Sequence, residues 1–402
     1  MLFSFAPPCR RLTSGLVLAA CAGALWAQPQ WPVPEDLDQN GVIDSQEIQR
    51  VIDATDSDTV FLPAKNTYRL TSPVMLARDH VQILGEGHGS SSQGGTILQL
   101  RGDTPAFIVE KCRGAAIRFC HVIGDREFHR SPGIIVRSAE KTALEDLRIT
   151  GTGCGISVTS SHETRIVDVA LRGIAGSWGF FIEGSAAAPT THTELARLSA
   201  AGAAGNTNVD WLVVSGLVDG LAIRSTRFIG GRRGLHFFGN PAPRNARIWR
   251  FGSDNAVGDA VHLEGGQNIT MINSWIGQPD GHGFIVGAEV DGLVLTNPRI
   301  RGAGGHGLKI EGGRNIAVNN PLIGANGRAF PPGSMIGAGI AISEHARHVI
   351  VQGGRVGPLY NQGKGAKQYF SIDYAGTKAD AKRNTILIVN VNTADNPIRL
   401  AP

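Results

Sequence analysis

Short apolar phrases recur along the chain at intervals of about two dozen residues. Each phrase consists of a small residue, an apolar residue, one variable residue and a second apolar residue. The phrases begin at Gly133 (GIIV), Gly155 (GISV), Gly179 (GFFI), Asp210 (DWLV), Gly234 (GLHF), Ala260 (AVHL), Gly283 (GFIV), Gly307 (GLKI), Gly339 (GIAI) and Tyr369 (YFSI). Alternation of apolar residues with period two predicts short strands rather than helices.

A second alternating phrase follows several of these strands, as in ITMIN from Ile269 and LVLTN from Leu293. The last residues of this second phrase are Ser225, Asn273, Asn297, Asn320 and Gly353. A third apolar step then follows at Phe228, Ile276, Ile300, Ile323 and Val356. Each repeat therefore contains three short strands, with asparagine recurring at one corner.

This repeat predicts an all-β fold, a right-handed parallel β-helix whose coils pair at about 4.8 Å and stack their alternate side chains into one core. We expect about 11 or 12 coils over residues 56–402, without an internal domain boundary, after a short capping helix within residues 28–55. Gly makes up 53 of 402 residues, and only 18 % are charged. That composition excludes coiled coils and ordinary helix bundles.

A basic start followed by an apolar stretch predicts a secretory signal over residues 1–27. Arg10 and Arg11 precede the apolar residues 12–26, and a small residue, Ala27, ends the segment. A lipoprotein signal that leaves an acylated Cys21 is the alternative. Both place the mature chain in the periplasm or outside the cell. No other apolar run approaches the roughly 20 residues of a membrane helix, so we expect no transmembrane segment.

Cleavage after residue 27 leaves Cys112, Cys120 and Cys154. An odd number of cysteines cannot form a complete disulfide framework, although one pair is possible. The formal net charge of +4 is too small to indicate a nucleic-acid partner. The binding chemistry must therefore be sought in local clusters.

One segment before the repeats matches the calcium-binding loop pattern D-x-[DN]-x-[DN]-G-x5-E. Its oxygen ligands would come from Asp36, Asp38, Asn40, the carbonyl of Val42, Asp44 and Glu47. Hard Ca²⁺ takes six or more oxygens at this spacing, and its role here would be structural. The alternative is that the same residues only cap the solenoid, with Asp44 or Ser45 as the N-cap of the helix 46–54.

The segment that opens the solenoid resembles the pectate-lyase-like β-helix superfamily. The similarity lies in GVIDSQEIQRVIDA from Gly41, TVFLPAKNTYRL from Thr59 and VQILGEG from Val81. The resemblance implies that a short helix caps the first coil. It indicates the fold far more strongly than an activity.

Titratable side chains gather at outward positions of the coils that begin between residues 234 and 307. They are His236, Asp259, His262, Glu264, His282, His306, Lys309 and Glu311, and Arg233 stands one coil before Asp259 at the corresponding position. The third strands add Trp275 and Arg299, which suit the apolar face of a sugar and its carboxylate. Together these residues suggest a groove for an acidic polysaccharide. The alternative is a solubilising surface of cross-coil ion pairs.

Within this cluster, GDAVHLEGG from Gly258, GHGFIVG from Gly281 and GLKI from Gly307 resemble polygalacturonase-type glycoside hydrolases. The resemblance implies that Asp259 is a catalytic carboxylate, His282 the catalytic histidine and Lys309 the residue that binds the uronate. Ala260 stands where that family has a second aspartate. Hydrolysis needs two carboxyl groups, and Glu264 is the one that could supply the second.

The residues leave three functions open. One is a hydrolase, and another is a lyase that abstracts the proton at C5 of a uronate, for which His282, His306, Lys309 and Arg299 are suitable types. The third is a glycan-binding or structural rod without catalysis. The predicted catalytic residues are Asp259, His282, His306 and Lys309. The predicted substrate-binding residues are Arg233, His262, Glu264, Trp275, Arg299 and Glu311.

Overall fold

The computed structural model describes residues 31–87, 94–125, 130–202, 207–329, 337–357, 368–393 and 398–400. The predicted signal segment, with Cys21, lies outside these residues, as do parts of the long insertions before residues 339 and 369. Within the described part of the chain, no helix combines the length and apolar character needed to cross a membrane.

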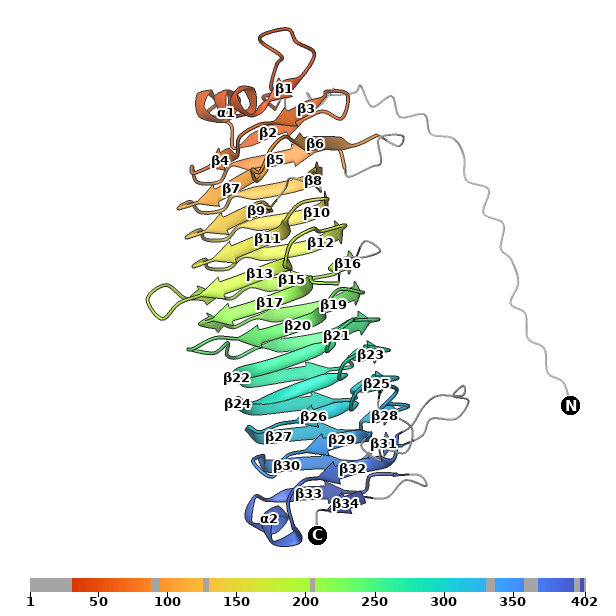
Figure 1. Cartoon of the computed structure of the whole chain (residues 1–402). Helices are drawn as coiled ribbons and strands as arrows, with labels where there is room; N and C mark the ends of the chain where they lie inside the picture. The colour runs from red at the N-terminus through yellow and green to blue at the C-terminus, as the bar shows by residue number, and fades with distance from the viewer. Residues whose placement is uncertain are drawn as a thin grey trace, which may run out of the picture. The chain divides into compact units, whose positions relative to one another are not determined.

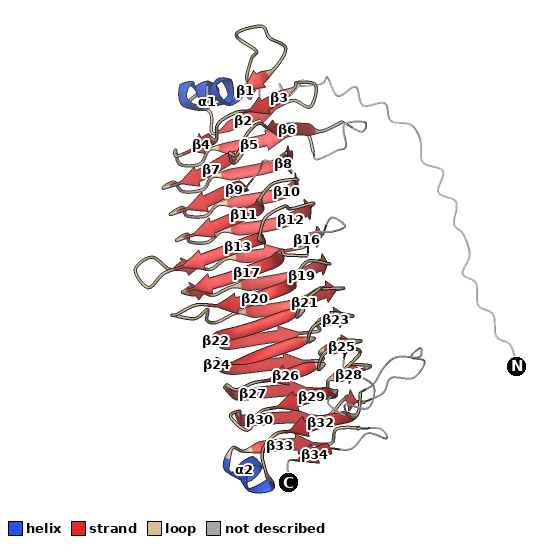
Figure 2. Cartoon of the chain, viewed as in Figure 1, coloured by secondary structure: helices blue, strands red, loops and turns tan. Residues whose placement is uncertain are grey.

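Residues 32–402 form a parallel β-solenoid of about 13 turns (Figures 1 and 2). Each turn contributes strands to three faces, and every strand pairs in parallel with strands of the neighbouring turns. The solenoid has one or two more turns than predicted. The ten apolar phrases found in the sequence do not include three of the turns. These turns contain the strands β4 (Val74–Leu76), β7 (Phe107–Glu110) and β34 (Ile398–Leu400).

The three faces are defined by their strands. Face 1 consists of β4, β7, β9 (Pro132–Arg137), β11 (Cys154–Thr159), β13 (Trp178–Gly184), β17 (Asp210–Gly216), β20 (Arg233–Phe238), the first half of β22 (Val261–Ile272), the first half of β24 (Phe284–Thr296), β26 (Leu308–Ile310), β29 (Ala338–Ile342), β32 (Phe370–Tyr374) and β34. Face 2 consists of β2 (Thr59–Leu62), β5 (Gln82–Gly85), the first halves of β8 (Ala116–Ile123), β10 (Ala143–Thr150) and β12 (Arg165–Arg172), β15 (Glu194–Ala196), the first halves of β19 (Ala222–Ile229) and β21 (Arg247–Asp254), the second halves of β22 and β24, β27 (Arg314–Asn319), β30 (Arg347–Gln352) and β33 (Ile386–Val389). Face 3 consists of β1 (Ile43–Asp44), β3 (Tyr68–Leu70), β6 (Thr96–Leu100), the second halves of β8, β10 and β12, β16 (Ser199–Ala201), the second halves of β19 and β21, β23 (Trp275–Gly277), β25 (Arg299–Arg301), β28 (Leu322–Gly324) and β31 (Arg355–Val356). Two short strands, β14 (Thr190–Thr191) and β18 (Val218–Asp219), pair separately, and the second helix, α2 (Lys378–Arg383), lies near the C-terminus.

The corner between faces 2 and 3 contains the predicted asparagine column. Asn273, Asn297 and Asn320 have φ values of 56°, 51° and 49°, in the left-handed region that asparagine tolerates better than most residues. The Asn297 side-chain amide also donates a hydrogen bond to Asn273 Oδ1 at 3.0 Å. One residue therefore makes each sharp corner, which keeps the coils in register.

Aliphatic and aromatic side chains fill the interior from the first coil to the last. Successive inward positions of the middle coils place Phe228 against Phe251 with their ring centroids 5.8 Å apart. Cys112, Cys120 and Cys154 are also buried, and none of them forms a disulfide. Apolar burial and the strand ladders therefore stabilise this fold, as the odd number of cysteines indicates.

The helix α1 (Ser45–Ala54) closes the N-terminal end of the solenoid, as predicted (Figure 1). Asp44 is its N-cap and accepts hydrogen bonds from the backbone of Gln46 and Glu47. The Glu47 side chain accepts in return from the Asp44 backbone at 2.9 Å, which completes a capping box. Ile48 and Ile52 on the helix are buried against the first coil.

Two phrases of the repeat pair one or two residues away from the predicted register. Leu212 pairs with Leu235, so Trp211 rather than Asp210 occupies the position of Gly234. Ile340 pairs with Ile372, which shifts the last phrase by two residues. A tryptophan can take the position of a glycine because the neighbouring Gly179 and Gly231 leave room beside the ring. The shift moves Asp210 into line with Arg233, at the edge of the predicted cluster.

Candidate active site

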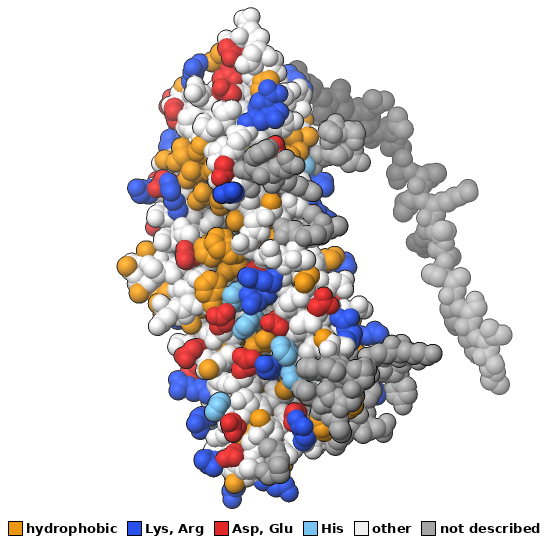
Figure 3. All heavy atoms as spheres, viewed as in Figure 1, with side chains coloured by type: hydrophobic (Ala, Val, Ile, Leu, Met, Phe, Trp, Pro, Cys, Tyr) orange, Lys and Arg blue, Asp and Glu red, His pale blue; other side chains and the backbone are white. Residues whose placement is uncertain are grey.

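The candidate site is a band of titratable side chains across the middle coils of face 1. Outward positions stack in register from His236 to His262 to Ile285 to Lys309. Figure 3 shows histidines, carboxylates and basic side chains gathered on this part of the surface. We call this set of residues the face 1 cluster, and its members are Asp210, Arg232, Arg233, His236, Asp259, His262, Glu264, His282, His306, Lys309 and Glu311.

Asp210 is the most buried charged group of the cluster, with 1 % of its side chain exposed. Arg232 donates to it from Nε at 2.8 Å and from Nη2 at 2.5 Å. Arg233 Nη1 and His236 Nδ1 lie 3.4 and 3.3 Å from Oδ2. Burial opposes ionisation, but the hydrogen bonds from Arg232 and His236 and the two guanidinium charges outweigh it and lower the pKa of Asp210 to about 2. Asp210 therefore anchors Arg233 and His236 as a permanent anion.

His236 links this buried anion to the surface. Ionised Asp210 can only accept hydrogen bonds, so Nδ1 of His236 carries a proton and donates it. Nε2 lies 2.7 Å from Oε1 of Glu264, whose side chain is half exposed. This contact connects the buried His236 ring to a carboxyl group at the surface of the cluster. His236 and Glu264 thus form a pair that can deliver a proton to a bound substrate.

His262 is the residue best placed to accept a proton. Its ring lies 5.6 Å from that of His236, and its Nδ1 lies 3.9 Å from Oδ2 of Asp259. Burial lowers the pKa of His262, and the nearby charge of Arg233 lowers it further. The ring is therefore neutral near pH 7. Nδ1 of His262 is buried and has no hydrogen-bond partner among the described residues, so a proton on Nδ1 leaves the Nε2 lone pair free to act as a base.

His282 and His306 are held in a different way. Their rings stack with centroids 5.2 Å apart. His282 Nδ1 accepts a hydrogen bond from the backbone of His306, and His306 Nδ1 accepts one from the backbone of Ala338. Burial lowers both pKa values, that of His306 to about 4. Each neutral ring therefore carries its proton on Nε2, so it can donate a hydrogen bond but has no lone pair with which to abstract a proton.

Two further predicted residues form an ion pair on the same face. Lys309 Nζ lies 2.7 Å from Glu311 Oε1, and both side chains are partly exposed. Lys309 follows Ile285 in the outward column, one coil beyond the position of His282. A substrate carboxylate can compete with Glu311 for this ammonium group, because the pair is open to solvent.

The structure brings together eight of the ten predicted catalytic and substrate-binding residues and separates the other two. Trp275 and Arg299 lie on face 3, where the described residues that line their hollow include no member of the cluster. Sequence reasoning missed the roles of Asp210 and Arg232. The available signal was that the phrase DWLV begins with an aspartate where the other phrases begin mostly with glycine. In the observed register Asp210 instead lies one residue earlier, in line with Arg233.

Among the residues that the structure describes, two groups of side chains have the donor atoms for a metal ion. His236, His262 and Glu264 each bring one ligand atom within 4.8 Å of the others. Asp36, Asp38 and Glu47 of the predicted calcium loop do the same. In that loop, Asp36 Oδ2 accepts from the Gly41 backbone at 2.6 Å. The predicted ligand Asp44 instead caps α1, so its carboxylate is already bound to the helix backbone.

Comparison with known proteins identifies the fold. No family model and no curated protein matches the sequence. The A-module of the mannuronan C-5 epimerase AlgE6 from Azotobacter vinelandii superposes with a TM-score of 0.55 at 15 % identity, covering 90 % of this chain and 93 % of that chain. The periplasmic alginate epimerase AlgG gives a TM-score of 0.53 at 12 % identity, covering 88 % of this chain and 84 % of that one. Tailspike protein 3 of bacteriophage CBA120 gives 0.58 at 12 % identity, covering 92 % of this chain and 61 % of that one.

These proteins are right-handed β-helices, and the likeness at such low identity concerns the fold alone. The chain has the right-handed parallel β-helix fold of pectate-lyase-like and polygalacturonase-like proteins, which confirms the prediction made from its repeats.

Proposed function

We propose that this protein is a secreted or periplasmic enzyme that acts on uronate-containing polysaccharide by abstracting the proton at C5 of a uronate. The observation that carries this proposal is the neutral His262, which lies beside the Asp259 carboxylate and near enough to the Arg233 guanidinium to feel its charge. A base beside a fixed cation suits the removal of a proton next to a carboxylate. The cation stabilises the negative charge that develops on that carboxylate.

The side chains divide the reaction among them. Arg233 binds and neutralises the carboxylate of the reacting uronate, and His262 Nε2 takes the C5 proton. Lys309 lies three coils beyond Arg233 and binds the carboxylate of a neighbouring sugar. The electron pair of the C5–H bond forms the C4–C5 double bond while the bond from C4 to the glycosidic oxygen breaks. The His236–Glu264 pair supplies the proton that this oxygen needs to leave. His282 and His306 position the strands and donate hydrogen bonds from Nε2.

Hydrolysis fits the cluster less well. It needs one carboxyl group as an acid and a second as a base or nucleophile. Asp210 is ionised, buried and held by two arginines, so it cannot serve as either. Asp259 Oδ1 accepts a hydrogen bond from the backbone of His282 at 2.7 Å. Of the two exposed carboxyl groups of the cluster, Glu264 pairs with a histidine, whereas Glu311 pairs with the Lys309 ammonium group.

Epimerisation is the second candidate, because it begins with the same proton abstraction. The proteins similar in fold include two described as C-5 or alginate epimerases. If the intermediate is reprotonated at C5 from the opposite side instead of losing its O4 substituent, the sugar is inverted and the chain stays intact. The same base and cations serve both outcomes.

Product analysis on polygalacturonate and alginate tests these proposals. A lyase gives new reducing ends together with ultraviolet absorbance from the unsaturated sugar, and His262→Ala abolishes both. An epimerase gives neither, but it changes the sugar composition seen by proton NMR. New reducing ends without absorbance would contradict the proposal and establish a hydrolase. A folded chain that gives none of these products would favour the glycan-binding rod.

We also propose that the loop of Asp36, Asp38 and Glu47 binds Ca²⁺ and stabilises the N-terminal cap. Three carboxylates converge there, and Ca²⁺ prefers such oxygen ligands. Glu47 also belongs to the capping box of α1, so an ion bound to it would be coupled to the helix that closes the core.

A further inference from the structure

A groove runs along face 3, away from the face 1 cluster. One hollow of about 580 Å³ is lined by Asn273, Ser274, Trp275, Asn297, Arg299, Asn320 and Leu322. A second hollow of about 290 Å³ is lined by Thr226, Arg227, Arg250, Phe251, Gly252, Ser253, Asp254, Asn273 and Trp275. The two hollows share Asn273 and Trp275, so they form one depression over five consecutive coils. We call it the face 3 groove.

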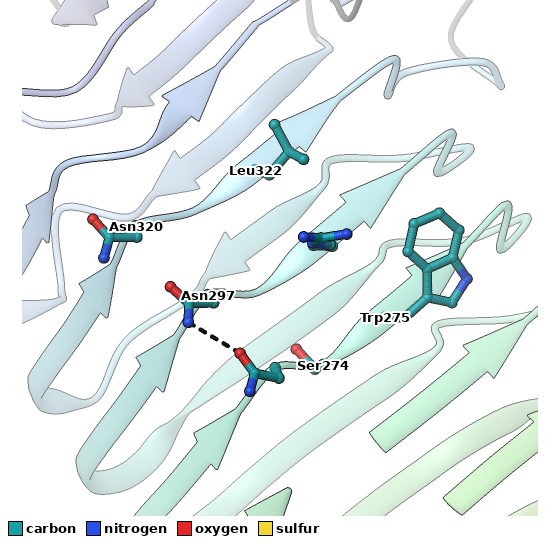
Figure 4. A pocket seen from close by; sticks show the side chains of 7 residues that line it. Ser274, Trp275, Asn297, Asn320 and Leu322 are labelled. Atoms are coloured by element: carbon teal, nitrogen blue, oxygen red, sulfur yellow. Dashed lines mark hydrogen bonds between the residues drawn. The ribbon is translucent and has the colours of Figure 1, made fainter. Parts of the chain in front are cut away.

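The floor of this groove offers apolar surface at fixed positions. Trp275, Arg299 and Leu322 occupy the same outward position in β23, β25 and β28. Trp275 is 45 % exposed and Leu322 is 36 % exposed. Figure 4 shows both side chains projecting from their strands, with the asparagine corner along one side. Each of these strands is anchored by a fully buried isoleucine, so the platform is rigid.

The arginines of the groove are not neutralised by carboxylates, unlike some arginines of face 2. On face 2, Arg118 and Arg165 share the carboxylate of Glu145. Across the described residues, by contrast, no carboxylate lies within ion-pair distance of Arg227, Arg250 or Arg299. Asp254 is the one carboxylate among the lining residues, against three arginines. The groove therefore presents unneutralised positive charge beside an indole ring.

We infer that the face 3 groove binds a strand of carboxylated polysaccharide lying along the solenoid axis. Arg227, Arg250 and Arg299 would pair with sugar carboxylates through forked hydrogen bonds, and Trp275 would stack against a sugar ring. Four coil steps at about 4.8 Å give a path of roughly 19 Å from Arg227 to Leu322, which spans several sugars. The asparagine corner supplies polar groups for the sugar hydroxyls.

This site shares its ligand class with the proposed enzyme but does not depend on turnover. It contains no residue of the face 1 cluster and no candidate base. A groove that holds polymer on a neighbouring face would keep the chain at its substrate between catalytic events, as a second point of attachment raises the effective concentration at the first.

Affinity electrophoresis of the mature chain in gels that contain polygalacturonate or alginate tests the inference, with dextran as the neutral polymer. We expect retardation by the acidic polymers and none by dextran. The double variant Trp275→Ala, Arg299→Gln should raise the apparent Kd for the acidic polymers at least tenfold. Arg172→Gln is the control, because Arg172 is also an exposed arginine of face 3 but does not line the groove. Circular dichroism verifies that each variant is folded.

Unchanged retardation of the folded double variant would overturn the inference, and so would equal retardation by dextran. A loss that follows Arg233→Ala but not the double variant would place all binding on face 1 and would also overturn it. Retardation without any product from these polymers would leave the groove supported while the proposed enzymatic activity fails, so the two proposals fail separately.

Discussion

Replacing Asp210 by Asn should destabilise the protein in a way that depends on pH. The substitution keeps the size of the side chain but removes the charge that holds Arg232, Arg233 and His236. The lowering of the pKa of Asp210 from 3.8 to about 2 corresponds to about 2 kcal/mol, at about 1.4 kcal/mol per pKa unit. Breaking a buried ion pair by removing one partner commonly costs about 3–5 kcal/mol. Arg232 is 45 % exposed and can return to water, so we expect a loss of about 2–3 kcal/mol at pH 7.

The sign of the pH dependence follows from the lowered pKa. A carboxyl group whose pKa falls on folding contributes stability above its unfolded pKa, and that stability is lost as the pH falls through the folded value. The difference between the wild type and Asp210→Asn should therefore be constant above about pH 5 and shrink between about pH 4 and pH 2. Urea denaturation measures it, because urea, unlike guanidinium, does not screen charges.

A matched surface pair provides the control. Arg197 binds Asp168 with two hydrogen bonds of 2.6 and 2.5 Å, the same geometry as the Arg232–Asp210 pair. Asp168 is 44 % exposed, so Asp168→Asn should cost less than about 1 kcal/mol. The reasoning is refuted if the two variants are equally stable at pH 7. It is also refuted if the loss in Asp210→Asn persists undiminished at pH 2.

Three further predictions concern catalysis, the metal loop and the asparagine corner. His262→Ala should lower kcat on a uronate polymer by about 10²–10⁴-fold. The acid limb of the pH profile of kcat/KM for the wild type should have its midpoint below pH 6.5, because burial lowers the pKa of His262. A midpoint at or above pH 6.5 would contradict the role of His262 as the base. Excess Ca²⁺ should raise the Tm of the wild type but not that of Asp38→Asn, as followed by calorimetry, and an equal rise in both would exclude this loop as the site. Asn297→Val should lower the free energy of unfolding by about 1–2 kcal/mol more than Asn297→Gly, because valine does not tolerate the positive φ of 51° at this corner. Equal urea midpoints for the two variants would show that backbone strain is unimportant there.

The fold could be predicted because the solenoid repeats the same local rules in every turn. A two-residue alternation places side chains in or out, and an asparagine at each corner satisfies the positive φ that the turn requires. These are short-range properties, so they are visible in the sequence. The capping box of Asp44 and Glu47 could also be predicted from the sequence, although the same residues also fit a calcium loop.

The candidate site could be predicted only in part, because it depends on register and on the angle between faces. Asp210 was assigned to the wrong column because Trp211 occupies a position that glycine fills in neighbouring coils. Trp275 and Arg299 were expected in one groove with the histidines, but the corner between faces 2 and 3 turns their strands onto another surface. The tautomers of His282 and His306 depend on backbone hydrogen bonds from the next coil, which no sequence pattern reveals.

We propose above that the face 1 cluster abstracts the proton at C5 of a uronate. The most direct test incubates the mature chain with polygalacturonate and alginate in heavy water and analyses the sugars by mass spectrometry and NMR. We expect either 4,5-unsaturated ends or deuterium at C5 of inverted sugars, in the wild type and not in a folded His262→Ala. Intact sugars without deuterium, from a folded and calcium-replete wild type that retains both polymers, would contradict it.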